Sequence, residues 1–113
     1  MSHRTEQVSE VIRHEISRLL LTEVEFPKNC LVTITRVSTS PDLRHAKILV
    51  SVMPVAYTGK ALERLRQNAG QLQFQLNQKL SLKPLPRISF GIDATEKQAA
   101  EIEALLDRIK ETD

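Results

Sequence analysis

The chain has 113 residues, of which 41% are hydrophobic and 27% charged, so it can bury one hydrophobic core and has the composition of an ordinary globular protein. No apolar run approaches the roughly 20 residues that cross a bilayer, and the polar, partly acidic first 15 residues are typical of neither a secretory signal nor a transit peptide. Cys30 is the single cysteine and has no partner for an internal disulfide, which suits a reducing compartment. We therefore expect a cytoplasmic protein without a membrane partner.

The charges are distributed unevenly along the chain. Ten basic and two acidic residues lie between Lys28 and Arg87, so this segment carries +8, whereas residues 1–27 carry −2 and residues 93–113 carry −4. A basic segment of this size attracts phosphate backbones. The charge asymmetry therefore favours a nucleic-acid partner.

The first predicted element is a helix over residues 5–23. Val8, Ile12 and Ile16 recur at helical spacing, and Thr5 is expected to be the N-cap. A β-hairpin follows over residues 30–55, where Thr, Val and Ile dominate two runs on either side of the turn sequence STSPDLRH. The second run alternates cleanly, but the first changes parity near Arg36, as a β-bulge would cause.

Helical periodicity returns over residues 58–80. Thr58 is expected to cap this segment, Leu62, Leu65 and Ala69 share one face, and Pro84 and Pro86 are expected to end it. Gly70 stands inside the segment, where a glycine costs roughly 1 kcal/mol relative to alanine. We interpret it as a bend, formed by Asn68, Ala69 and Gly70, that divides the segment into two helices.

A third strand and a last helix complete the pattern. RISFGID alternates between apolar and polar residues, and Thr95 and Gln98 form a capping box in front of a helix with an apolar stripe. That stripe comprises Ile102, Leu105, Leu106 and Ile109.

The resulting order, α-β-β-α-α-β-α, predicts an α+β two-layer sandwich with the helices on the sheet face that carries Ile48, Val50, Ile88 and Phe90. The long connection between the second and third strands permits parallel pairing. We expect a single domain over residues 1–113, with a core at 4–93 and an additional C-terminal helix at 94–113.

No constellation suggests catalysis, a cofactor or a metal. His3, His14 and His45 are scattered, Cys30 has no histidine beside it, and the three glycines form no phosphate loop. We expect no enzyme activity, no cofactor and no small-molecule substrate.

The α-β-β-α-α-β order resembles that of a type II KH domain, but the Gly-X-X-Gly loop that clamps nucleotides in such domains is replaced by Asn68-Ala69-Gly70. A KH-like module with a kinked Ala-X-Gly element resembles the bacterial ribosome-binding factor A family. RTEQVSEVIRHEISRLL, VTITRVSTSPDLRHAKILVSV and LPRISFGID are similar to that family's first helix, hairpin and closing strand. Asn68 and Gln73 depart from the alanine and arginine that the family tends to have.

The resemblance implies a non-enzymatic assembly factor that binds the immature small (30S) ribosomal subunit and its 16S rRNA, promotes 5′-end processing and supports growth in the cold, acting as a monomer. The alternatives are a generic KH-type RNA-binding module and a protein-interaction domain without RNA function.

The expected RNA contacts lie on exposed positions of the basic segment. We expect these side chains to gather on one side of the molecule beside the bend, and, because few aromatic residues are available, to recognise phosphates and shape more than bases. Phe26, Phe74 and Phe90 are expected in the core. The expected RNA-binding residues are Arg44, Lys47, Lys60, Arg64, Asn68, Gln71, Lys79 and Lys83.

Overall fold

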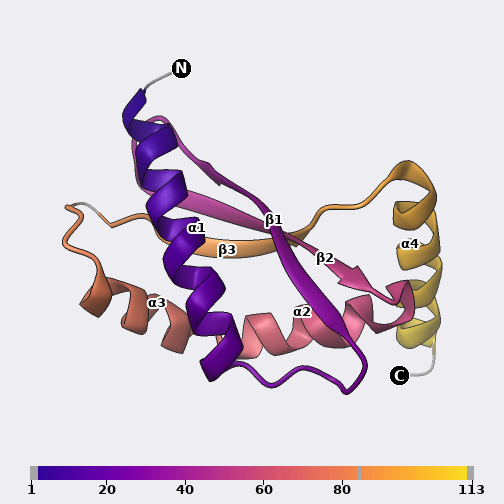
Figure 1. Ribbon diagram of the computed structural model, residues 1–113. Helices are drawn as coiled ribbons and strands as arrows, with labels where there is room; N and C mark the ends of the chain where they lie inside the picture. The colour runs from indigo at the N-terminus through magenta and orange to yellow at the C-terminus, as the bar shows by residue number, and fades with distance from the viewer. Residues whose placement is uncertain (1–2, 84, 112–113) are drawn as a thin grey trace.

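The structure, a computed structural model, describes residues 3–83 and 85–111, and the side chains of all of these except 96 and 106–111. Its elements follow the predicted order (Figure 1). They are α1 (His3–Glu23), β1 (Leu31–Thr39), β2 (His45–Met53), the 3-10 turn η1 (Val55–Tyr57), α2 (Thr58–Gln67), α3 (Ala69–Lys79), β3 (Arg87–Ile92) and α4 (Glu96–Glu111).

The three strands form one sheet in the order β1-β2-β3, with β1 antiparallel and β3 parallel to the central strand β2. Ile34 is paired with Val50 but Arg36 with Leu49, so Thr35 is an extra residue in β1. This confirms the predicted bulge. Its consequence is that Val37 points into the core and is buried, whereas Arg36 lies on the opposite face and is exposed.

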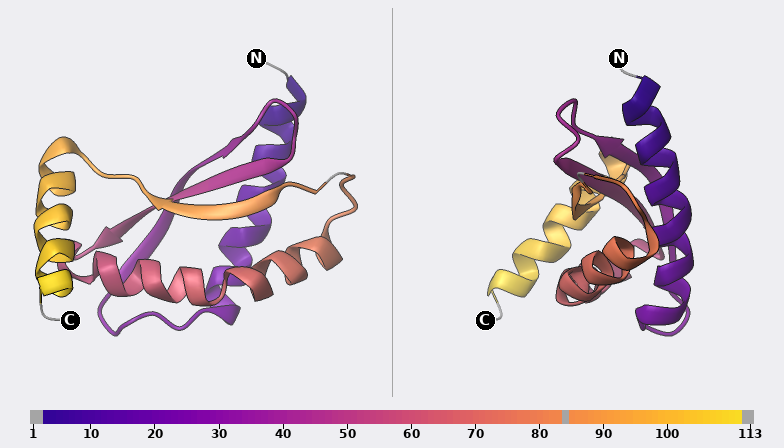
Figure 2. Two further views of the ribbon diagram at one scale, coloured as in Figure 1. Left: turned by 180° about the vertical axis from the view of Figure 1, so that it is seen from behind. Right: turned by 90° about the vertical axis from the view of Figure 1, so that its left-hand side faces the viewer.

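The core lies between one face of the sheet and helices α1, α2 and α3. α1 crosses the sheet and packs on β1, while α2 and α3 follow one another beneath β2 and β3 (Figures 1 and 2). Ile12, Ile48, Leu65 and Leu72 are completely buried at the centre of this layer. The α+β sandwich with a kinked helix pair, predicted from hydrophobic periodicity, is confirmed.

Helix α4 stands at one end of the molecule, where it contacts η1 and α2 (Figure 1). Its predicted capping box is confirmed, because the Thr95 N–H donates to Gln98 Oε1 at 3.1 Å and the Gln98 N–H donates to Thr95 Oγ1 at 3.2 Å. Ile102 is half-buried. The side chains of Leu106 and Ile109, which were also assigned to the apolar stripe, lie outside the described residues.

Two expected helix caps are wrong. Thr5 lies inside α1, which begins at His3, and is buried. Thr58 is the first residue of α2 rather than its cap, because η1 immediately precedes it and its N–H donates to the carbonyl of Val55. Both threonines sit on the core side of their helices, where burial of the side chain outweighs the capping preference. Pro84, expected to help end the second helix of the pair, lies outside the described residues; α3 ends at Lys79.

Candidate nucleic-acid interface

Helix α2 exposes two of the predicted cations on the side that faces away from the sheet. Lys60 and Arg64 are both exposed, whereas Ala61 and Leu65, the next residue after each, are completely buried against the sheet. This four-residue spacing places the ammonium and the guanidinium on neighbouring turns of one helix face. We refer to Lys60, Arg64 and the adjoining Asn68 as the α2 face.

The helix pair is interrupted at Asn68, not at Gly70. Asn68 leaves helical geometry with φ −99° and ψ 2°, and its side-chain amide donates to the carbonyl of Arg64 at 2.8 Å. Gly70 lies inside α3 without a positive φ, and a Cβ placed on it would meet no atom within 4 Å. The expectation that the missing Cβ of Gly70 permits the bend is therefore wrong; Asn68 forms the junction and satisfies a carbonyl at the end of α2 with its own side chain.

The exposed side of α3 differs from the sequence-based expectation. Phe74, expected in the core, is 59% exposed, while Phe90 is buried and Phe26 is partly buried. Gln71, an expected RNA contact, is exposed and donates to Glu23 at 3.2 Å. The periodicity of α3 alone could have predicted that Phe74 is exposed, because this residue lies midway between the buried Leu72 and Leu76 and so points to the opposite side of the helix.

Gln73, which departs from the family pattern, has a structural role. Its Oε1 accepts from the Ile88 N–H at 2.8 Å, and its Nε2 donates to the Pro86 carbonyl at 3.2 Å and to Asn77 Oδ1 at 3.0 Å. The side chain therefore ties α3 to the start of β3, an edge strand whose N–H groups need partners. It is half-buried in this position.

Arg44 is positioned by a tightly hydrogen-bonded hairpin turn. The Ser40 hydroxyl donates to Asp42 Oδ1 at 2.6 Å, the Arg44 N–H donates to the same oxygen at 3.0 Å, and the His45 N–H donates to Ser40 Oγ at 3.0 Å. Leu43 takes a left-handed conformation with φ 61°. Two hydrogen bonds hold the pKa of Asp42 below its usual value: the Ser40 hydroxyl has the larger effect and the Arg44 N–H the smaller one.

Lys47 lies on the sheet face that α1, α2 and α3 leave open, because it alternates with the buried Ala46 and Ile48. Arg36 and Arg87 are exposed on the same face, in β1 and β3. Neither was among the RNA-binding residues expected from the sequence. The bulge in β1 and the alternation in β3 were the signals that could have identified them. We refer to Arg36, Lys47 and Arg87 as the open sheet face.

The predicted RNA-binding residues therefore do not all gather on one side. The α2 face and the open sheet face lie on opposite sides of the two-layer sandwich, so the expectation of one continuous basic side is wrong. Periodicity indicates which residues share a face of one element, but the face that each element turns outward depends on packing between elements. Lys79, at the end of α3, and Lys83, in the following loop, are both exposed.

The cations of both faces lack carboxylate partners. Among the residues whose side chains the structure describes, no carboxylate forms an ion pair with these cations, whereas Arg13 pairs with Glu10 and Arg18 with Glu15 on α1. Glu63, the one acid on α2, accepts a hydrogen bond from Gln67 instead. Unpaired surface cations are free to exchange their counterions for phosphates.

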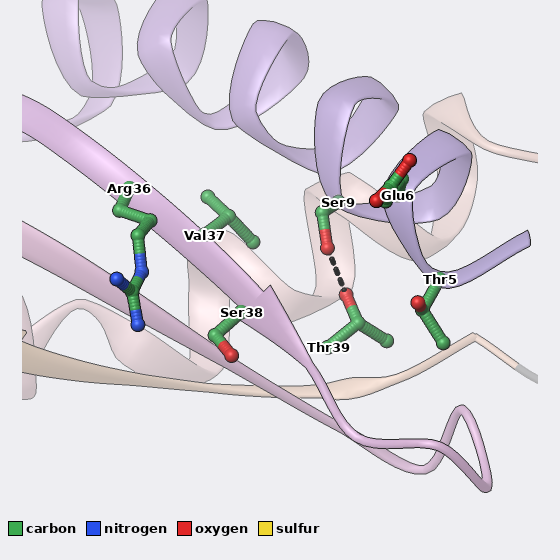
Figure 3. A pocket seen from close by; sticks show the side chains of 7 residues that line it. All are labelled: Thr5, Glu6, Ser9, Arg36, Val37, Ser38 and Thr39. Carbon is green, nitrogen blue, oxygen red and sulfur yellow. Dashed lines mark hydrogen bonds between the residues drawn. The ribbon is translucent and has the colours of Figure 1, made fainter. Parts of the chain in front are cut away.

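A polar pocket lies between the first turns of α1 and the edge strand β1 (Figure 3). Ser9 and Thr39 are joined across it by a hydroxyl–hydroxyl hydrogen bond of 2.7 Å, and Glu6 and Arg36 also line it. In the part of the chain that the structure describes, no three His, Cys, Asp or Glu side chains come together as a metal site requires. Nor does any described helix combine the length and hydropathy that a bilayer crossing requires.

Comparison with known proteins identifies the family. The sequence profile of the ribosome-binding factor A family matches residues 4–106. The chain belongs to this family. It is 36% identical over 113 residues to ribosome-binding factor A of Nitrosococcus oceani, covering 97% of this chain and 89% of that protein. It is 31% identical to the Azotobacter vinelandii protein of the same name, covering 93% and 84%.

Solved structures of the ribosome-binding factor A family share the fold. A solution NMR structure from Thermotoga maritima superimposes with a TM-score of 0.67 at 25% identity, covering 85% of this chain and 93% of that one. A crystal structure from Thermus thermophilus, at 22% identity, gives a TM-score of 0.57 over 80% and 91% of the two chains. These likenesses support a KH-like fold for the chain.

Proposed function

We propose that this protein is a cytoplasmic, monomeric and non-enzymatic assembly factor that binds the immature 30S ribosomal subunit through its 16S rRNA. Membership of the ribosome-binding factor A family supports the ribosome as the partner. The α2 face is the observation that supports RNA as the ligand. On it, Lys60 and Arg64 are exposed beside the Asn68 junction and have no carboxylate partner.

The proposed action is a shift between rRNA conformations. A protein that binds an immature arrangement of the RNA more tightly than the mature one stabilises the former by the difference in binding free energy. Such binding needs no covalent step. We further propose that it promotes 5′-end processing of the 16S rRNA and matters most at low temperature, where misfolded RNA rearranges slowly.

The direct test is co-sedimentation with immature small-subunit particles. Lys60→Gln/Arg64→Gln is expected to weaken particle binding at least fivefold and to leave thermal unfolding nearly unchanged, because both side chains are exposed. The matched control is Arg13→Gln/Arg18→Gln, which removes the same charge from α1. Equal losses in the two double variants would show that only net charge matters.

Salt dependence separates RNA binding from the alternatives. Affinity for the particle is expected to fall steeply with salt, with a slope that corresponds to about 4–7 phosphate contacts. A flat response would favour a protein-interaction domain. Binding to mature and immature particles with equal affinity would favour a generic RNA-binding module. In cells, loss of the protein is expected to slow growth in the cold and to leave 5′-extended 16S rRNA.

A further inference from the structure

The open sheet face carries three cations on three different strands. The strand register gives the position of each cation along β2. Arg36 lies opposite Leu49, and Lys47 lies in β2 itself, two residues before Leu49. Arg87 lies opposite His45, two residues before Lys47. Each step to the next strand therefore moves the cation two residues in the same direction along β2. With about 4.8 Å between strands and about 3.3 Å per residue, the three Cα positions form a diagonal line with steps of roughly 8 Å.

The hairpin turn lies beside one end of the diagonal. The carbonyl of Arg44 accepts from the Arg87 N–H at 2.8 Å, so the backbone of Arg44 lies beside the Arg87 end of the line. Arg44 is itself exposed. Three cations from β1, β2 and β3 thus follow one path across a surface that no described helix covers, and the exposed Arg44 of the turn lies beside its Arg87 end.

Small residues flank Lys47 in the neighbouring strands. Ser38 and Ser89 are the register partners of Lys47, and Gly91 is the β3 partner of Leu49. A Cβ on Gly91 would lie 2.9 Å from Cε of Lys47 and 3.2 Å from Cδ2 of Leu49. The missing side chain at Gly91 therefore leaves the space in which the Lys47 side chain lies along the sheet.

Two acidic residues lie near the ends of this path, and each is engaged by hydrogen bonds. Asp42 is engaged by the Ser40 hydroxyl and the Arg44 N–H within the turn. Beside the Arg36 end of the path, Asp93 accepts from the hydroxyl of the bulge residue Thr35 at 2.7 Å. Asp42 attracts Arg44 electrostatically, whereas no described carboxylate forms an ion pair with Arg36, Lys47 or Arg87.

The ligand class follows from the side chains present. A line of cations without ion-pair partners suits a polyanionic backbone, whereas base recognition on a sheet needs aromatic platforms. None of the chain's four Phe and Tyr residues lies on the open sheet face, but the exposed imidazole of His45 does, opposite Arg87 in the register. With three cations and one imidazole, the face is better suited to phosphates than to reading bases.

We propose that the open sheet face is a second RNA-backbone site, separate from the α2 face, and that one copy of the protein holds two RNA segments, one on each side of the sandwich. The proposal rests on the proposed function in taking RNA as the ligand. Because the sheet and its helix layer separate the two faces, a short duplex bound on one side does not reach the other. Arg36, Lys47 and Arg87, continued by Arg44, bind the second segment.

The test is an RNA-bridging assay with the full-length protein. Two 12-base-pair RNA duplexes, one carrying a donor and one an acceptor dye, are mixed with the protein at low salt, and sedimentation in the same buffer establishes that the protein is monomeric. The wild type is expected to produce energy transfer. Arg36→Gln/Lys47→Gln/Arg87→Gln is expected to reduce transfer at least tenfold while one duplex still binds, as measured by anisotropy. Arg13→Gln/Arg18→Gln/Lys97→Gln, with the same loss of charge elsewhere, is expected to retain transfer.

A second variant changes the geometry of the site without changing its charge. Gly91→Ala displaces the flexible end of Lys47 and is expected to weaken binding of the second duplex three- to tenfold, with an unchanged melting temperature. Undiminished transfer in both the triple variant and Gly91→Ala would overturn the inference. The proposed function would fail on a different result, namely that the wild-type protein does not bind small-subunit particles. That result is independent of the energy transfer measured in the bridging assay.

Discussion

Replacing Gly70 with alanine tests whether the helix junction depends on a glycine. Gly70 lies in α3 without a positive φ, and the added Cβ would meet no atom within 4 Å. Alanine therefore fits without strain, and it restricts the unfolded chain more than glycine does. Because Gly70 is near the start of α3, we expect a gain of about 0.5–1 kcal/mol.

The assay is thermal unfolding followed by circular dichroism. With an unfolding entropy of about 2.1 cal/mol/K per residue, the expected gain raises the melting temperature by roughly 2–4 °C. Asn68→Ala is the counterpart: it removes the 2.8 Å hydrogen bond to the Arg64 carbonyl and is expected to cost about 0.5–1.5 kcal/mol. A lower melting temperature for Gly70→Ala would refute the reasoning, because it would show that the junction needs the conformational freedom of glycine.

Other side chains give predictions of different kinds. The exposed ring of Phe74 can stack on an unpaired base, which contributes about 1–3 kcal/mol. Phe74→Ala is therefore expected to weaken binding of single-stranded RNA about five- to a hundredfold in anisotropy titrations and to leave duplex binding unchanged. Equal effects on both RNAs would contradict base stacking on Phe74. Gln73→Ala leaves the Ile88 N–H without its partner and is expected to lower the free energy of unfolding in urea by about 1–3 kcal/mol; an unchanged urea midpoint would argue against the tie between α3 and β3. The lowered pKa of Asp42 stabilises the hairpin above the usual aspartate value of about 3.9, and this contribution is lost as the pH falls through the lowered pKa. Asp42→Asn is therefore expected to flatten the acid side of the melting-temperature profile, and an unaltered profile would contradict this role.

The family resemblance and the element types follow from local sequence. The alternation around Ile48, the helical stripe from Val8 to Leu20 and the capping box at Thr95 each depend on residues close together in the chain, and the structure confirms all three. The bulge near Arg36 was also detectable in the sequence, because one inserted residue changes the parity of the apolar positions in a strand.

Tertiary packing decided what local sequence left open. Thr5 and Thr58 are buried helix residues rather than caps, and Phe74 is exposed, because the neighbouring elements determine which side of a helix faces the core. The two basic faces could not be separated in the sequence, where their residues all belong to one +8 segment. Only the packing of α2 and α3 on one side of the sheet separates the cations of α2 from those on the strands, since the sheet itself lies between them.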